Sequence, residues 1–169
     1  LEEDPEPARR LIDNAADSGY CRCFDTLLEL QCFVGSPSVT LQKVALLCKL
    51  REDGSAKYRL VWDFRRSGTN AMVQLNERIV LPRLSDAIEA ALRCCRVSHT
   101  RVELEWLVLD FADAFHYVVL AQKYWKHNCA FIDGRFVCFT VLSFGGSGFP
   151  NLWGRPGCGF HRAPFGRLH

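Results

Sequence analysis

Two apolar stretches, each divided by an Asp-Gly turn, restrict the fold of this chain more than any other feature. The first stretch covers residues 44–64 and turns at Asp53-Gly54. The second covers residues 128–141 and turns at Asp133-Gly134. An Asp-Gly pair between strand-like segments is a strong local signal for a β-hairpin, because both turn residues readily adopt the required positive φ. The sequence therefore predicts two hairpins in an antiparallel sheet.

The first hairpin carries basic residues close to its turn. Lys49 and Arg51 belong to the first strand and the turn, and Lys57 and Arg59 belong to the second strand. The alternation of a strand places Lys57 and Arg59 on one face. The opposite face is then apolar and carries Tyr58, Leu60, Trp62 and Phe64. Such a basic tip either protects an exposed edge from aggregation or binds an anion, and both interpretations stay open here.

A third segment, residues 105–116, passes from an apolar run into a carboxylate and a tight turn. Residues 107–109 are typical of a short, buried central strand, and Asp110 follows where that strand leaves the sheet. An aspartate in this place either caps the next helical turn or holds a hard cation through its oxygens. Asp110 is therefore the first candidate for chemistry.

Apolar residues at helical spacing predict three helices, over 8–16, 24–33 and 85–95. The second helix should end before Gly35, and Ser85 should cap the third. We expect the third helix to bury one apolar stripe, formed by Leu84, Ile88, Ala91 and Leu92. Together with the hairpins, these helices predict an α+β fold in which helices flank an antiparallel sheet.

The predicted elements divide the chain into three parts. Residues 1–43 form a helical N-terminal segment, and residues 44–155 form the main unit. Residues 156–169 form an irregular tail, because Pro156 and two nearby glycines interrupt a helix there.

Composition limits the classes of function. The 169 residues are 49% hydrophobic with a net charge of +2, so the chain is globular and is not a general polycation for nucleic acid. No apolar stretch reaches the ~20 residues that cross a bilayer, so we expect a soluble intracellular protein, cytoplasmic or nuclear, with no membrane partner. The chain begins at Leu1 and contains one methionine, Met72, which suggests a piece of a longer product.

The chain contains nine cysteines, at positions 21, 23, 32, 48, 94, 95, 129, 138 and 158. The odd number and the lack of a signal-like segment favour structural thiols in a reducing compartment. Zinc is the alternative, with ligands from Cys21 and Cys23, from the adjacent Cys94-Cys95 with His99, or from His127 and Cys129. None of these groups has the two-residue spacer of a standard zinc knuckle.

Gly145 and Gly146 lie in a glycine-rich loop after the second hairpin. Glycine allows a backbone to approach a ligand closely, and exposed N–H groups suit phosphate. Alone, this is a weak signal for a site.

Taken in order, five stretches resemble the fingers and palm of reverse transcriptases from retroviruses and retrotransposons. They are residues 57–65, 79–86, 109–115, 131–142 and 144–150, so the resemblance covers about residues 44–155. It implies the fingers and partial palm of an RNA-directed DNA polymerase from a Pol-type polyprotein. Such an enzyme transfers a nucleotide from a dNTP to a primer 3′-hydroxyl on an RNA or DNA template, with two Mg²⁺ ions stabilising the attacking and leaving oxygens.

The resemblance also implies roles for individual residues. Asp110 matches the catalytic aspartate that binds metal, and the backbone carbonyl of Phe111 matches a further metal ligand. Arg59 matches the fingers arginine on the incoming triphosphate. Lys49 or Arg51 lies near the position of the other fingers cation.

The remaining implied roles concern the sugar and the base. Asp113 and Ala114 match the turn whose backbone N–H groups face the triphosphate, and Phe115 matches the ring that excludes a ribose 2′-hydroxyl by steric clash. The loop with Gly145 and Gly146 matches the segment beside the nascent base pair. At Phe144 the chain departs from retroviral enzymes, which carry a glutamine there.

The second carboxylate motif of the family, an aromatic-x-Asp-Asp hairpin, has no match. The chain contains no Asp-Asp pair and no acidic residue after Asp133. We therefore expect the isolated chain to be inactive as a polymerase and to bind Mg²⁺ weakly at most. Two alternatives stay open: a non-catalytic remnant that binds nucleic acid or protein, and a zinc-stabilised interaction module.

Overall fold

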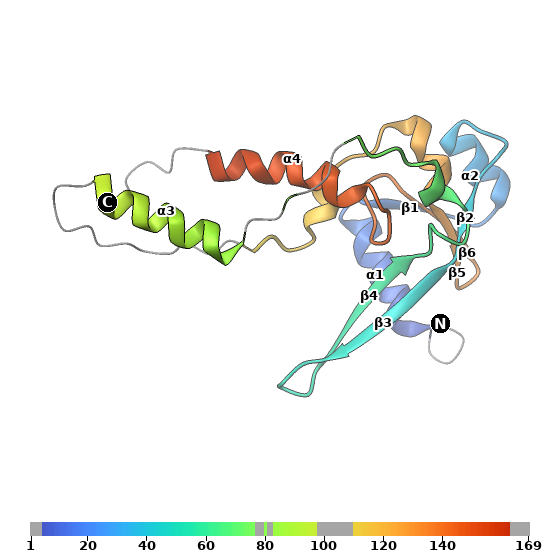
Figure 1. Cartoon of the computed structure of the whole chain (residues 1–169). Coiled ribbons are helices and arrows are strands. Elements are labelled where there is room, and N and C mark those ends of the chain that lie inside the picture. The colour runs from blue at the N-terminus through green and yellow to red at the C-terminus, as the bar shows by residue number, and fades with distance from the viewer. Residues whose placement is uncertain (1–4, 77–79, 81–82, 98–109, 163–169) are drawn as a thin grey trace.

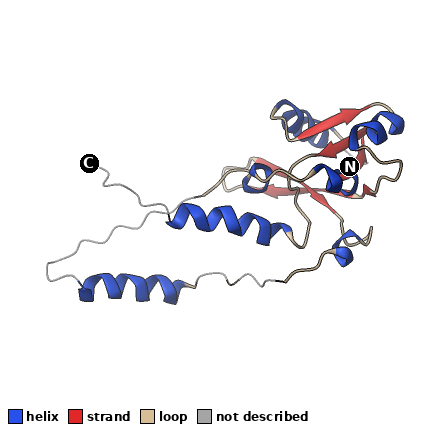
Figure 2. Cartoon of the chain, turned by 90° about the horizontal axis from the view of Figure 1, so that it is seen from above, coloured by secondary structure: helices blue, strands red, loops and turns tan. Residues whose placement is uncertain are grey.

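The computed structural model describes residues 5–76, 80, 83–97 and 110–162, with the backbone alone for 156–162. The chain is α+β, as expected, and has two small sheets flanked by helices (Figures 1 and 2). Among the described residues, no helix is both long enough and apolar enough to cross a membrane.

The larger sheet has four strands in the order β1-β6-β5-β2. Its two pairs β1–β6 and β5–β6 are antiparallel, but β2 runs parallel to β5. The sheet is therefore mixed, and the expectation of a purely antiparallel sheet was wrong at this edge. A parallel pair cannot be joined by a hairpin, and residues 43–128 separate these two strands in the chain. The strands are β1 (Cys21–Phe24), β2 (Leu41–Gln42), β5 (Cys129–Ile132) and β6 (Arg135–Phe139).

Both predicted hairpins are confirmed. Strands β3 (Val44–Leu50) and β4 (Ala56–Trp62) form the second sheet, and β5 and β6 form the other hairpin. The turn residues Gly54 and Gly134 have φ values of 78° and 77°, and Asp133 has a φ of 48°. The β3–β4 hairpin extends away from the four-stranded sheet (Figure 1).

Helix α1 (Glu6–Asp17) packs on one face of the larger sheet. Its small and apolar residues Ala8, Ile12 and Ala15 are buried there. The side chain of Trp62 from β4 joins the same core and contacts the ring of Phe139 edge-on at 4.7 Å. This core therefore connects the basic hairpin to the larger sheet. Its other buried members are Cys21, Val44, Leu60, Phe64, Ala130, Ile132, Val137 and Val141.

Helix α2 (Leu27–Val34) packs on a second core with Cys129 and Cys138, which alternate along β5 and β6 with members of the first core. Thr26 and Glu29 form a capping box at its start, and Gly35 ends it in the left-handed conformation. The predicted start at residue 24 was wrong, because Phe24 belongs to β1.

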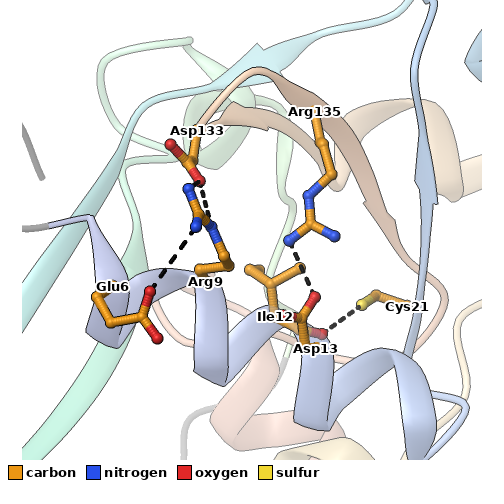
Figure 3. Close-up of polar contacts among 7 residues, drawn as sticks. All are labelled: Glu6, Arg9, Ile12, Asp13, Cys21, Asp133 and Arg135. Carbon is orange, nitrogen blue, oxygen red and sulfur yellow. Dashed lines mark hydrogen bonds and ion pairs between the residues drawn. The ribbon is translucent and has the colours of Figure 1, made fainter.

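Two ion pairs tie α1 to the β5–β6 hairpin (Figure 3). The Arg9 Nε atom donates to Asp133 Oδ2 at 2.7 Å, and Arg135 Nη2 donates to Asp13 Oδ1 at 2.9 Å. All four side chains are partly exposed, so each pair adds little stability and mainly fixes the orientation of the helix.

Strands β1 and β2 lie in the segment expected to be helical alone. Because they pair with β6 and β5, residues 1–43 share one sheet with the second hairpin. The prediction that residues 1–43 form a helical segment therefore missed these two strands.

Helix α3 (Leu84–Val97) extends away from both sheets (Figures 1 and 2). Its expected buried stripe is exposed instead, with Leu84 at 78%, Ile88 at 50% and Leu92 at 49% of full exposure. The helix is amphipathic, as its spacing predicts, but no neighbouring element among the described residues covers its apolar side.

Helix α4 (Phe149–Arg162) continues past Pro156 into the segment expected to be irregular. A proline removes one backbone donor from a helix, which weakens or bends it, and the other helical hydrogen bonds persist. Residues 163–169 lie outside the described residues.

The close approach of Gly145 to β4 predicts that a side chain at this position destabilises the fold. Gly145 has a φ of 119°, and a Cβ atom there would lie 2.0 Å from the carbonyl oxygen of Trp62. We expect Gly145→Ala to lower the free energy of unfolding by roughly 2–4 kcal/mol, from backbone strain and this clash. Urea denaturation measures the change.

Gly54→Ala is the matched control, because Gly54 also has positive φ, but an added methyl group there would have no atom within 4 Å. It should cost only about 1 kcal/mol. Equal losses in both variants would contradict the packing role of Gly145.

Candidate functional site

A pocket of about 450 Å³ lies where β4, the segment after residue 109 and α4 meet. Helix α1 and strand β6 of the larger sheet complete it, since α1 contributes Leu11 and Ala15 and β6 contributes Phe139. The pocket therefore combines polar side chains from loops and strand ends with an apolar wall from the core. Its remaining lining residues are Lys57, Tyr58, Arg59, Leu60, Trp62, Asp110, Phe111, Ala112, Asp113, Ala114, Phe115, His116, Phe144 and Trp153.

The structure brings six of the candidate residues to this one pocket, although Arg59 is separated from the others by about fifty residues of chain. They are Arg59, Asp110, Phe111, Asp113, Ala114 and Phe115. Asp110 and Arg59 are both exposed. The predicted central strand at residues 107–109 lies outside the described residues.

A short 3₁₀ helix, η2 (Ala114–Tyr117), carries two of the rings that line the pocket, Phe115 and His116. Asp113 precedes it in the left-handed conformation, and its carbonyl accepts a hydrogen bond from the His116 N–H at 2.7 Å. On the other side, the rings of Phe111 and Trp153 meet edge-on at 5.5 Å, so α4 fixes the segment that carries Asp110.

Lys49 and Arg51 do not line this pocket. They line a shallow hollow at the tip of the β3–β4 hairpin, together with Lys57, which lines both spaces. Lys49 lies directly opposite Lys57 in the strand register. Like charges in this arrangement repel, so an anion at the tip would stabilise the pair.

Gly145 and Gly146 do not line this pocket either. Packing within the chain explains why both positions are glycine. Gly145 lies against the backbone of Trp62, and a Cβ atom at Gly146 would lie 2.6 Å from the Phe149 ring. Gly146 instead lines a second, more apolar cavity of about 450 Å³, with Phe149 and Leu152.

An aromatic cluster forms one side of the pocket. The rings of Phe115 and Phe144 lie 5.2 Å apart, and Phe144 lies 6.1 Å from His116. The Arg59 Cζ atom lies over the Phe144 ring at 5.4 Å from its centre. The ring of Tyr20 lies tilted against that of His116, with centroids 4.7 Å apart.

His116 is the titratable group of the pocket with a shifted pKa. Burial among aromatic rings lowers the pKa of His116 below its ordinary value of 6.5, and the nearby Asp113 carboxylate partly opposes this shift. The Nδ1 atom of His116 is buried, and no described residue forms a hydrogen bond with it. The imidazole is therefore neutral near pH 7.

Sequence reasoning missed several residues of the pocket. One of them, Lys57, could have been identified from the strand alternation, which places it on the same face as Arg59. His116 follows Phe115 directly, but its burial depends on Tyr20 and Phe139. Phe111 and Trp153, whose rings are in contact, are also far apart in the sequence. No local pattern indicates such contacts.

The oxygen donors of the pocket suit one magnesium ion. Asp110 and Asp113 both line it, and Mg²⁺ is commonly held by one or two carboxylates together with substrate phosphates. Across the described residues, no group of three or more His, Cys, Asp or Glu side chains is placed to hold a metal. The described donors thus fit a cation that arrives with phosphate.

The cysteines are divided between core and surface. Cys21, Cys129 and Cys138 are buried, while Cys48 on β3 is exposed. Burial raises the pKa of the Cys21 thiol, and its sulfur lies 3.7 Å from the carbonyl oxygen of Ile12 (Figure 3). These buried thiols fit the expected structural role. His99, a member of one possible zinc group, lies outside the described residues.

A scan against protein-family models and a search of curated proteins found no match to this chain.

The lowered pKa of His116 predicts a dependence of stability on pH. Above pH 6.5 the imidazole is neutral in both the folded and the unfolded chain. Below it, the unfolded chain takes up the proton first, so the free energy of unfolding falls as the pH falls toward the lower folded pKa. We expect His116→Phe to reduce this loss, measured by urea denaturation between about pH 7 and 5.

Tyr117→Phe is the control, since Tyr117 lies on the same short helix and its side chain is 64% exposed. It should leave the pH dependence unchanged. A His116→Phe variant with an unaltered slope would contradict the burial argument.

Proposed function

We propose that the pocket binds the triphosphate of a deoxynucleotide together with one Mg²⁺ ion, as part of a reverse-transcriptase-like polymerase. One observation carries the proposal: Arg59 and Asp110, far apart in sequence, line the same pocket as Phe115. These residues were selected from the sequence and its resemblance to reverse transcriptases. Their meeting in one space supports the fingers-and-palm interpretation.

The charges of the pocket match such a ligand. Arg59 and Lys57 supply positive charge, and Asp110 and Asp113 supply negative charge. The cationic side chains would bind phosphate oxygens, and a guanidinium can do so through two parallel hydrogen bonds. The two carboxylates and the Phe111 carbonyl would hold the cation, which neutralises phosphate charge and orients the triphosphate when bound.

The aromatic cluster would serve the sugar. Phe115 lies in the pocket beside the acidic segment, where a ring beneath the deoxyribose excludes an added 2′-hydroxyl by steric clash. An RNA or DNA template-primer would lie along the basic hairpin, outside the pocket. The remainder of a Pol-type polyprotein would supply the rest of the palm.

Within these 169 residues we propose binding without turnover. In-line nucleotidyl transfer uses two cations, held by more carboxylates than Asp110 and Asp113 provide. No acidic residue follows Asp133 in the chain.

The test is the affinity of the chain for dATP relative to dAMP in the presence of magnesium, followed through tryptophan fluorescence. We expect a clear preference for dATP. Arg59→Gln should weaken dATP binding by about 10-fold or more, because a charge-assisted hydrogen bond contributes roughly 1.5–3 kcal/mol. Asp110→Asn should remove the dependence on magnesium.

Arg93→Gln is the matched control, because Arg93 lies on α3 and pairs with Glu89. It removes the same charge away from the pocket and should leave dATP binding unchanged. Equal affinities for dATP and dAMP in the unsubstituted chain would refute the proposal.

A further inference from the structure

Phe144 occupies a central place in the pocket that the implied roles do not explain. Its ring touches three pocket residues at once: the Arg59 guanidinium, the Phe115 ring and the His116 ring. It is only half-buried and does not belong to either buried core cluster. Its position thus serves the pocket more than the packing of the sheets.

The backbone fixes this ring in place. The Trp62 N–H donates a hydrogen bond to the carbonyl oxygen of Phe144 at 2.8 Å. The next residue, Gly145, lies so close to Trp62 that no side chain fits between them. Phe144 is thereby held against the strand that also carries Arg59.

The Arg59 side chain extends over the Phe144 ring. Within the described parts of the chain Arg59 forms no ion pair, and its guanidinium lies over the Phe144 ring at 5.4 Å. A cation over an aromatic face is attracted by the negative charge of the ring face. Arg59 is nevertheless exposed, so it can still donate to a ligand.

We propose that Phe144 is a positioning residue whose ring holds the Arg59 guanidinium over the pocket, ready for phosphate. The inference rests on the proposed triphosphate site and adds to it the residue that orients its main cation. A long, free arginine side chain loses rotamer freedom when it binds. A side chain already held in place loses less, and therefore binds more tightly. The same ring also touches Phe115, so it links the phosphate side of the pocket to the sugar side.

The first measurement tests the geometry without any ligand. The Arg59 Nε–H proton should show a ring-current shift in the NMR spectrum, identified by its disappearance in Arg59→Gln. We expect Phe144→Leu to remove this shift and Phe144→Tyr to retain it. Phe131→Leu is the control, because Phe131 is 54% exposed and its ring contacts Phe136 in the other hairpin.

The second measurement is binding of dATP and dAMP, with magnesium, to the same variants. Phe144→Leu should weaken dATP binding by about two- to five-fold and leave dAMP binding unchanged, as expected for loss of one cation–π contact. Phe144→Tyr should restore the affinity. A merely structural role would weaken both nucleotides alike and would not be rescued by tyrosine.

The outcomes separate this inference from the proposed function. If the unsubstituted chain prefers dATP but Phe144→Leu changes neither the Arg59 shift nor the dATP affinity, the positioning role is overturned and the site stands. If the unsubstituted chain shows no preference for dATP, both proposals are overturned.

Discussion

The backbone contact between Trp62 and the loop at Phe144-Gly145 is the constraint on which the site depends. One hydrogen bond of 2.8 Å joins Trp62 to Phe144, and the absence of a side chain at Gly145 permits the approach. The Trp62 side chain is buried against Phe139 of the larger sheet. Strand β4 is therefore fixed to the sheet on one side and to the loop on the other. This double attachment sets the direction in which the basic hairpin leaves the body of the protein.

The pocket follows from that attachment. Because β4 is held in place, Arg59 lines the same pocket as Asp110. Helix α4 supports the segment that carries Asp110 through the Phe111–Trp153 contact. Positive and negative side chains then meet around one space beside an aromatic wall. The ligand we propose, a nucleoside triphosphate with Mg²⁺, is an anion that carries a cation with it and so matches both signs of charge. The hairpin tip places Lys49 opposite Lys57, and the acidic residues Glu52 and Asp53 line the same hollow.

Local signals determined what the sequence could predict. Both hairpins carry their turn residues directly between the strands they connect, and Gly35 ends its helix through its own backbone conformation. Strands β1 and β2 were missed because four- and two-residue strands are defined by distant partners rather than by a pattern of their own. The apolar stripe of α3 predicted a helix correctly, but it could not indicate what covers that helix. At the site, the position of Asp110 after an apolar run made it a candidate, and the resemblance to reverse transcriptases selected Arg59. The contact of Arg59 with Phe144 depends on packing that no local pattern contains.

The most direct test of the account is whether a cation at Asp110 lies beside Arg59 when a triphosphate is bound. Manganese can replace magnesium and broadens the NMR signals of nearby nuclei. With dATP and Mn²⁺, the account predicts broadening of the Arg59 Nε–H and Phe115 N–H signals, none at Leu30 in the second core, and loss of the effect in Asp110→Asn. Broadening confined to the hairpin tip, or unchanged by Asp110→Asn, would contradict it.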